Sequence, residues 1–574
     1  MKPEFRAIDR RFADFICRES GRESSELRLA AALLSSAVGK GDICLNLFHS
    51  GGMESPPAGE PFLLPPPERL IAILRESPTV GAPGDFTPLV LDGAGRLYLH
   101  RYWRYENELA RVILEKASGT EPLCEETLRE GLSRLFPESA GEEINWQEVA
   151  AIAALRKKLC IISGGPGTGK TSTVVKILAL MIEQHSGRRL RIALAAPTGK
   201  AAARLNDSIS RMRASLPCSD EVKLQIPATV STIHRLLGAI SGSVRFRHSA
   251  ENPLPHDVVI IDEASMVDLP LMAKLVTALK PEARLILLGD RDQLASVEAG
   301  AVLGDLCGAG SKESYSCDLL VVLKKNYRFL SNSGIGRLAT ALNAGNGAQA
   351  LALLRDDTWS DIVWRDLPDV ASLKKVLAPE IIDGYSHYLA AVTAEEALSR
   401  FDAFRLLCAL REGPYGVVGI TRLIEEVLAE QGLIDLQSRW YRGRPVMITV
   451  NDHGLKLFNG DVGIVFPDPE LSGLPRVYFP APDGGVRTIA PVRLPAHETV
   501  YAMTVHKSQG SEFGRLLMLL PDHDTAVLSR ELLYTGITRA MNEVRIWGNQ
   551  EVFMEASGRR IRRSSGLADA LRRE

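Results

Sequence analysis

The sequence predicts an α/β protein of several domains, built on parallel sheets that carry helices on both faces. Its 574 residues are too many for a single hydrophobic core, so three or more domains are expected. From about residue 140, apolar strand-length runs alternate with amphipathic stretches, which is typical of βαβ units. The predicted strands are 158–163, 191–196, 257–261 and 284–289, and the clearest predicted helices are 170–184 and 199–213.

Composition changes along the chain predict where its domains lie. A second α/β region begins near residue 320, after a small and polar run at 308–317 that is typical of a linker. Short strands with Gly and Pro turns at about 435–495 predict a small β-barrel inserted in that region. The expected domains are a mainly helical N-terminal domain at 1–125, a first α/β domain at 126–318 and a second at 319–574.

Bulk properties narrow the class of protein. Hydrophobic residues make up 45% and charged residues 24%, as in ordinary globular proteins, and the net charge of −2 neither favours nor excludes a nucleic-acid partner. No apolar run approaches the roughly 20 residues of a membrane span, and the N-terminus has no signal-like core, so a cytoplasmic protein is expected. The eight cysteines include no C-x-x-C pair, which favours reduced thiols over a zinc site or disulfides.

A phosphate-binding loop is the strongest local pattern. The segment GGPGTGKT (164–171) follows the predicted strand KLCIIS and opens a predicted helix. Glycines let successive backbone N–H groups point at phosphate oxygens, aided by the helix N-terminus. In such a loop Lys170 faces the β- and γ-phosphates, and the Thr171 hydroxyl can bind Mg²⁺. Taken alone, the loop predicts only that a nucleoside triphosphate binds.

Two acidic residues follow an apolar run that is expected to form a buried strand. A nucleoside triphosphate site needs its metal-binding acid at such a position. Asp262 and Glu263 end the run VVII, 92 residues after the lysine (262 − 170). Asp262 is expected to hold Mg²⁺ through water, and Glu263 to orient and deprotonate the attacking water. The pair favours hydrolysis over transfer to an acceptor, although an acidic helix cap is the alternative interpretation. After the next strand, Asp290 and Gln293 are placed to sense the γ-phosphate, or to cap a turn.

Further segments follow these patterns in order along the chain. They are INWQEVAAI (144–152), APTGKAAARL (196–205), STIHRLLG (231–238), LLGDRDQL (287–294), LKKNYRF (323–329), RGRPVMITVNDHGLKLFNGDVGIV (442–465), TVHKSQGSEF (504–513) and RELLYTGITRA (530–540). With GGPGTGKT and IIDEASMVD (260–268), they resemble the superfamily-one helicases, and within these the RecD family, the alpha subunits of exonuclease V. The segment LVLDGAGRLYLHRYWRYENELA (89–110) also resembles this family, whereas longer stand-alone RecD-like helicases have a different N-terminal extension.

The resemblance implies a fold and an activity. It implies two RecA-like P-loop motor domains that use ATP and Mg²⁺ to move 5′→3′ along single-stranded DNA. It also implies RecB-like and RecC-like partners in double-strand break repair and homologous recombination, with any nuclease activity in another subunit. The alternatives are a stand-alone RecD-like helicase, a non-motor P-loop ATPase such as a kinase, and a structural subunit whose ATP site only drives assembly.

The resemblance also implies roles for residues of the nucleotide site. Gln147 would contact the adenine edge, and Arg328 and Arg539 would act as arginine fingers that reach across from the second motor domain. The catalytic residues are expected to be Lys170, Glu263, Gln293, Arg328 and Arg539, and the Mg²⁺ ligands Thr171 and Asp262. The expected nucleotide-binding residues are Gln147, Gly164, Gly165, Pro166, Gly167, Thr168, Gly169, Lys170, Thr171, Ser172, Gly510 and Glu512, the last a weaker candidate for a ribose contact.

Short hydroxyl and basic side chains in the remaining motifs match positions that face the DNA strand or couple it to the nucleotide. They are Thr198, Thr232, His234, Thr504, His506, Lys507, Ser508 and Gln509. Such side chains suit sugar–phosphate contacts without sequence readout, so sequence-tolerant and salt-sensitive binding is expected. For the segment at about 241–256, the resemblance implies a small β-hairpin at the point of strand separation, where Arg245, Arg247 and His248 would meet DNA; a solvated loop explains them equally well.

Overall fold

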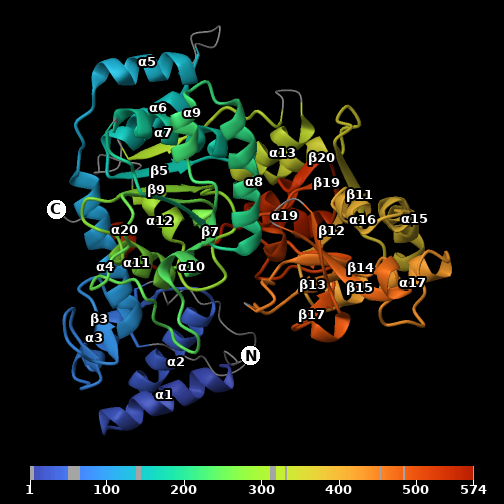
Figure 1. The fold of residues 1–574 in the computed structure, drawn as a ribbon. Coiled ribbons are helices and arrows are strands. Elements are labelled where there is room, and N and C mark those ends of the chain that lie inside the picture. The colour runs from blue at the N-terminus through green and yellow to red at the C-terminus, as the bar shows by residue number, and fades with distance from the viewer. Residues whose placement is uncertain are drawn as a thin grey trace.

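The computed structural model describes residues 5–48, 65–137, 144–185, 187–309, 319–329, 333–452, 454–481 and 485–572. The expected linker at 308–317 lies mostly outside these residues. Figure 1 shows the N-terminal domain below the first motor domain, with the second motor domain beside the first. None of the helices in the described ranges is both long and apolar enough to cross a membrane.

The N-terminal domain combines helices with a small sheet. Its helices are α1 (Ala7–Ser20), α2 (Ser25–Gly39), α3 (Pro67–Arg75) and α4 (His100–Ser118), whereas α5 (Glu125–Leu135) packs against α7 (Lys170–Gln184) of the first motor domain. Its strands are β1 (Cys44–Asn46), β2 (Val80–Gly81), β3 (Leu89–Leu91) and β4 (Arg96–Leu99), in the order β1-β4-β3-β2. Arg96 N donates to Asp92 Oδ1 at 2.9 Å and closes the β3–β4 turn. The chain between Leu89 and Leu99 therefore forms a hairpin in a four-stranded sheet.

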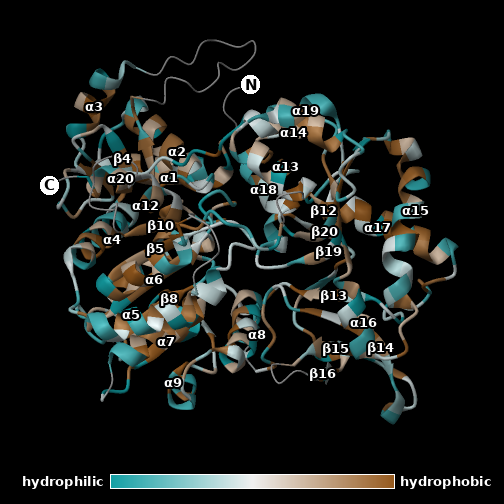
Figure 2. Ribbon diagram, turned by 90° about the horizontal axis from the view of Figure 1, so that it is seen from above, coloured by the Kyte–Doolittle hydropathy of each residue, from teal (hydrophilic) through white to brown (hydrophobic). Residues whose placement is uncertain are grey.

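The first motor domain is a parallel sheet of six strands in the order β10-β5-β9-β8-β6-β7. These strands are β5 (Leu159–Ser163), β6 (Ile192–Ala196), β7 (Ser231–Thr232), β8 (Val258–Ile261), β9 (Arg284–Gly289) and β10 (Leu320–Val322). The helices are α6 (Trp146–Arg156), α7 (Lys170–Gln184), α8 (Gly199–Ser215), α9 (Asp220–Gln225), α10 (Ile233–Leu237), α11 (Leu269–Thr277) and α12 (Val302–Ala309). Helices cover both faces, so central strands such as β5, β8 and β9 are buried and consist mostly of apolar residues (Figure 2).

One strand of this sheet lies beyond the expected domain boundary. β10 pairs with β5, Leu320 opposite Ile161, so the first sheet extends past residue 318. A strand of three residues carries too little pattern to reveal which sheet it joins.

The second motor domain repeats the architecture. Its parallel sheet has the order β11-β20-β19-β12-β18, from β11 (Ile362–Asp366), β12 (Phe404–Cys408), β18 (Ala502–Thr504), β19 (Phe513–Leu519) and β20 (Ala540–Gly548). The helices are α13 (Gly334–Asn343), α14 (Gly347–Leu354), α15 (Val370–Leu389), α16 (Ala394–Phe401), α17 (Val417–Glu430), α18 (Arg530–Ile537) and α19 (Gln550–Gly558). The expected second α/β domain is confirmed.

An antiparallel sheet is inserted between α17 and β18, where a small barrel is expected. Its strands are β13 (Pro445–Ile448), β14 (Val462–Asp468), β15 (Leu474–Pro480), β16 (Val486–Ile489) and β17 (His497–Thr499), in the order β16-β15-β14-β13-β17. Val446, Val465, Val477 and Phe479 form a separate small core. Among the described residues, β16 and β17 do not pair with each other, so closure into a barrel stays a prediction.

Two further segments bear on the expected domains. The segment 241–256 is mostly irregular, with a single antiparallel bridge between Ala239 and Phe246 near its start, so the expected hairpin stays a prediction. After α19, the chain leaves the second motor domain, and α20 (Leu567–Ala570) packs against α12 and α4. Figures 1 and 2 both show this end of the chain beside the first motor domain and the N-terminal domain. The last residues of the expected second domain thus lie elsewhere.

Candidate nucleotide and nucleic-acid site

The phosphate loop joins β5 to α7 and needs its glycines. Gly167 and Gly169 have φ of +84° and +81°, in the left-handed region that other residues rarely adopt. A Cβ on Gly169 would lie 2.4 Å from Gln147 Nε2. Gln147 Nε2 donates to Thr168 O at 3.3 Å, so the residue expected at the adenine does lie against the loop.

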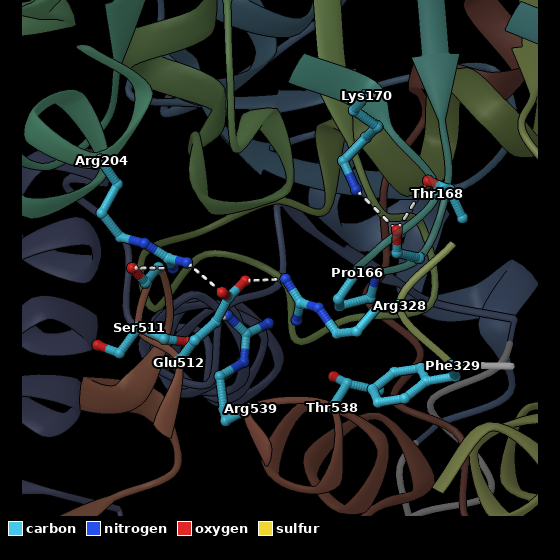
Figure 3. Close-up of polar contacts among 12 residues, drawn as sticks. Pro166, Thr168, Lys170, Arg204, Arg328, Phe329, Ser511, Glu512, Thr538 and Arg539 are labelled. Atoms are coloured by element: carbon cyan, nitrogen blue, oxygen red, sulfur yellow. Dashed lines mark hydrogen bonds and ion pairs between the residues drawn. The ribbon is translucent and has the colours of Figure 1, made fainter. Parts of the chain in front are cut away.

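Side chains of the loop fold back onto its own backbone. Lys170 Nζ donates to Gly164 O at 2.5 Å. It also donates to Gly165 O at 3.1 Å, an oxygen that accepts from Thr168 Oγ1 as well (Figure 3). Ser172 Oγ donates to Gly169 O at 2.9 Å. Thr171 is half-buried in the first turn of α7. The loop therefore holds an ammonium group and a helix N-terminus at one place, which is the arrangement that binds phosphate.

The two expected acids lie at the end of β8. Glu263 N donates to Asp262 Oδ1 at 2.9 Å, and Glu263 has a φ of 52°, a strained conformation for this residue. The carboxyl group of Asp262 is enclosed, although part of the residue reaches the surface. This burial raises the pKa of Asp262, the charge of Glu263 adds to the rise, and Lys170 opposes it. Charges of both signs are therefore held close together.

The end of β9 connects the two motor domains. Asp290 Oδ2 accepts from Tyr534 Oη at 2.9 Å and from Gln293 Nε2 at 3.1 Å, and burial raises the pKa of Asp290. Leu294 N donates to Thr535 Oγ1 at 2.9 Å, and Leu294 O accepts from the second domain as well. Residues 290–294 thus touch both domains.

Charged residues from three parts of the chain meet beside the loop. Arg204 Nη2 pairs with Glu512 Oε2 at 2.6 Å, and Arg328 Nη2 donates to Glu512 Oε1 (Figure 3). Burial alone would raise the pKa of Glu512, but the charges of Arg204 and Arg328 hold it below the ordinary value. Arg539 is 3% exposed, with Nε donating to Thr535 O at 3.1 Å. Glu512 therefore contacts arginines of the site in this structure.

Two guanidinium nitrogens in this cluster have no partner among the described residues. They are Arg328 Nη1 and Arg539 Nη2, and both are buried. Buried N–H groups are nearly always hydrogen-bonded, so both nitrogens are suited to an anion in the cleft. The charge of Glu263 also acts on Arg539, which places this arginine close to the acids at the end of β8.

Arg328 was expected to come from the second motor domain, but it does not. It follows β10, and its segment lies on the phosphate loop: Tyr327 N donates to Gly167 O at 2.8 Å, and Asn326 Nδ2 to Pro166 O at 2.9 Å. A Cβ on Gly167 would lie 2.3 Å from Arg328 Cβ. Arg539, in contrast, follows α18 of the second domain.

The expected DNA-binding residues fall into two groups. Thr198 and Thr232 cap α8 and α10, and Thr504, His506 and Lys507 are half-buried at the end of β18. His234 is exposed and packs edge-on against Phe246.

Ser508 and Gln509 form the second group, because both are buried. Ser508 Oγ donates to Val505 O at 2.7 Å, and Gln509 Nε2 to Leu294 O at 3.0 Å. Their hydrogen bonds are to other parts of the protein, whereas contacts with a DNA strand were expected.

Lys507 lies in an open groove that the motifs do not reveal. Its Nζ pairs with Glu498 Oε1 at 2.6 Å, and Arg411 Nη2 pairs with Glu498 Oε2 at 3.1 Å. The groove holds a cavity of about 650 Å³ lined also by Arg439, Thr449 and His497. It is rich in basic groups and lies between the second motor domain and its inserted sheet.

Arg204 and Tyr534 were not singled out from the sequence. Both lie inside the quoted segments APTGKAAARL and RELLYTGITRA, which is the signal that could have found them. Their partners are far away in sequence: Arg204 pairs with Glu512, and Tyr534 donates to Asp290.

Comparison with known proteins assigns the chain to a family. A family model described as "RecBCD enzyme subunit RecD, N-terminal domain" matches residues 2–98, an "AAA domain" matches 147–299, and a "UvrD-like helicase C-terminal domain" matches 499–547. The chain is 41% identical over 559 residues to the RecBCD enzyme subunit RecD of Mycobacterium tuberculosis, covering 97% of this chain and 93% of that protein. The chain belongs to the RecD family.

Other relatives agree with the RecD assignment. The RecD subunit of Haemophilus influenzae is 36% identical over 527 residues, covering 83% of this chain and 80% of that protein. The ATP-dependent RecD2 DNA helicase of Deinococcus radiodurans is 31% identical over 488 residues, covering 84% of this chain but 59% of that protein. The RecD resemblance drawn from the order of the motifs is confirmed.

Proposed function

We propose that this chain moves 5′→3′ along single-stranded DNA as the RecD-type subunit of a complex with RecB-like and RecC-like partners. Membership of the RecD family makes it an ATP-dependent DNA helicase of DNA repair and recombination. The direction, the partners and the residue roles are the proposed parts. Its place of action is the cytoplasm, where bacterial DNA lies.

The observation that carries the mechanism is the convergence of arginines on the phosphate loop. Arg539 comes from the second motor domain, Arg328 from the connection between domains, and each has a buried nitrogen with no partner among the described residues. A planar cation placed at the γ-phosphate stabilises the charge that develops as this group leaves. We therefore assign these nitrogens to the γ-phosphate oxygens, and Lys170 to the β- and γ-phosphates.

The acids at the end of β8 complete the chemistry. The oxygen atoms of Asp262 and Thr171 fit Mg²⁺, which takes hard oxygen ligands and retains water. When bound, Mg²⁺ neutralises charge on the phosphates. Glu263 accepts a proton from the attacking water, and its left-handed backbone directs its side chain differently from that of Asp262. Gln147 holds the base against the loop.

Hydrolysis would be coupled to movement through the end of β9. Gln293 and Asp290 lie beside the loop, and Leu294 hydrogen-bonds to Thr535 of the second domain. Loss of the γ-phosphate removes the anion that Arg539 and Gln293 share, so the second domain is released. Repeated closing and opening of this cleft is the stepping motion.

The DNA strand is assigned to the surface that carries Thr198, Thr232, His234, Thr504, His506 and Lys507. Hydroxyl and basic groups contact the sugar–phosphate chain without reading bases. Binding therefore tolerates any sequence and weakens with salt.

The direction is tested by unwinding of tailed duplexes. A complex of this chain with its RecB-like and RecC-like partners, in which the RecB-type motor is inactivated, should open duplexes with a 5′ single-stranded tail. Arg539→Ala in this chain should stop that opening while nucleotide and DNA binding persist. Opening that requires a 3′ tail would overturn the proposed direction.

A stand-alone helicase is the second candidate, because the chain is similar to the RecD2 helicase of Deinococcus radiodurans. The match of residues 2–98 to the N-terminal domain of RecD subunits favours the complex. Co-purification from the native host distinguishes the two: two larger partners in fixed ratio support the subunit, and an unaccompanied chain with full unwinding activity supports the alternative.

A further inference from the structure

The C-terminal segment crosses from the second motor domain to the opposite side of the molecule. After α19 it is fastened to the N-terminal domain, where Ser564 N donates to Asp42 Oδ1 at 2.7 Å and Gly566 N to Glu106 Oε2 at 2.9 Å. Leu567 and Leu571 are buried in the core that the N-terminal domain shares with the first motor domain. We call residues 559–572 the C-terminal strap.

Arg563 is the strap's contact with the loop that follows β9. Its Nη2 donates to Ser296 O at 2.6 Å, and its Nη1 donates to Glu298 O and to Gly300 O, each at 2.8 Å. One guanidinium group thus holds three backbone carbonyls of residues 296–300. The rigid fork of arginine suits this task, because its donors are fixed relative to one another.

The loop 296–300 is the direct continuation of the end of β9. Ser296 lies three residues after Gln293 (296 − 293), and Leu294 between them is already hydrogen-bonded to Thr535 of the second motor domain. At its far side, Gly300 N donates to Gly41 O at 2.9 Å. The segment that carries Gln293 is therefore held at one end by α18 and at the other by the strap.

We propose that Arg563 is a positioning residue for ATP turnover, which holds residues 296–300 so that Gln293 stays directed at the γ-phosphate. The proposal rests on the role assigned to Gln293 above. In the contacts described, Arg563 touches neither the phosphate loop nor Lys170. Its effect on Gln293 would therefore pass through residues 296–300. Its removal takes the guanidinium donor from Ser296 O and leaves Ser296 Oγ as the side-chain donor to Glu298 O and Gly300 O, while the anchors at Asp42, Glu106 and Leu567 keep the strap in place.

This role predicts that replacing Arg563 lowers the affinity for one kind of nucleotide only. When residues 296–300 no longer hold Gln293 in place, the chain binds a nucleotide with a γ-phosphate more weakly. Its affinity for ADP, which has no γ-phosphate, stays unchanged. Substitutions along a coupling network change coupling by about 0.5–2 kcal/mol, which corresponds to about a 2- to 30-fold change in affinity. A purely stabilising role would weaken both nucleotides equally or neither.

The test compares the affinities of the full chain for AMP-PNP and ADP, with Mg²⁺, by fluorescence titration. Arg563→Ala should bind AMP-PNP about 2- to 30-fold more weakly with ADP affinity unchanged. Arg562→Ala is the matched control, because Arg562 is exposed on the same strap, and it should bind both nucleotides like the unmodified chain. If Arg563→Ala does not fold, Arg563→Gln keeps one amide donor and should show the same selective loss.

Equal loss for both nucleotides, or no loss for either, would overturn the proposal. The readout needs no DNA, so it is separate from a failure of the proposed function. That failure would appear as an unmodified chain whose ATP turnover ignores single-stranded DNA.

Discussion

Glu263 combines a left-handed backbone with a carboxylate beside the enclosed Asp262. Such backbone conformations cost about 1–3 kcal/mol and persist where the surrounding structure enforces them, often at functional sites. In the proposed function, Asp262 holds a metal ion and Glu263 accepts a proton.

Glu263→Gln is expected to bind ATP and to lose hydrolysis. The amide keeps the size of the side chain but cannot accept a proton, and general-base catalysis contributes about 10²–10⁴-fold. Steady-state turnover with single-stranded DNA, beside nucleotide titration, measures both effects. Glu282→Gln, at an exposed position of the same domain, is the control. Normal turnover in Glu263→Gln would show that another group accepts the proton.

Residues whose role depends on local spacing were predictable from sequence. Lys170, Asp262 and Glu263 lie at fixed places in a loop or after a strand, so the pattern alone places them. Arg204 and Tyr534 were missed because their partners, Glu512 and Asp290, are hundreds of positions away. Contacts at that separation come from the packing of domains, which no short motif records.

Among the elements, the turn η5 (His506–Ser508) after β18 directs neighbouring side chains into different surroundings. Its tight winding turns Lys507 towards the groove, where it pairs with Glu498, and buries Ser508. Neighbouring residues of one motif therefore do different things, which explains why the motif as a whole could not be assigned to DNA.

Lys507→Ala is expected to weaken single-stranded DNA binding and its dependence on salt. Losing one phosphate contact lowers the slope of log affinity against log salt by about 0.7. Fluorescence anisotropy at several salt concentrations gives that slope. Lys375→Ala, on the exposed side of α15, should leave it unchanged. An unchanged slope in Lys507→Ala would remove Lys507 from the DNA surface.

The elements themselves were predictable to different degrees. Long apolar strands such as β5 and β9 and their intervening helices follow from periodicity, because both faces are buried. The short β10 joins a sheet across the expected boundary, and this placed Arg328 in the wrong domain. The segment 241–256 lacks the alternation of a strand, and only the resemblance suggested a hairpin there.

At the scale of the whole molecule, the strap ties the end of the chain to the N-terminal domain. Glu106 of α4 is 3% exposed and accepts from Gly566 N, Ser565 Oγ and Tyr98 Oη. Burial outweighs these hydrogen bonds and raises the pKa of Glu106 above its ordinary value of 4.5. No sequence pattern revealed this arrangement, because it joins residues 460 positions apart.

Glu106→Gln is expected to change how stability depends on pH. Because the folded pKa is raised, the folded protein keeps a proton that the unfolded chain loses above 4.5, so stability falls as pH rises through that window. Glutamine cannot ionise, so the melting temperature of the variant relative to the unmodified chain should be higher at about pH 8 than at about pH 5. For a cooperatively unfolding unit of about 150–250 residues, a difference of about 2–4 °C corresponds to roughly 1 kcal/mol.

Thermal unfolding at the two pH values measures this shift. Glu115→Gln, at an exposed position of the same helix, should show no such change. A Glu106→Gln curve parallel to that of the unmodified chain would mean that Glu106 is ionised in the fold at both pH values.

In the proposed function, the two motor domains hydrolyse ATP in response to a DNA strand. Its most direct test is ATP turnover by the purified chain, with and without single-stranded DNA, beside Lys170→Ala. We expect strong stimulation by DNA, abolished by Lys170→Ala in a folded protein. Turnover that ignores DNA, in a folded chain that also fails to bind a single strand, would contradict it.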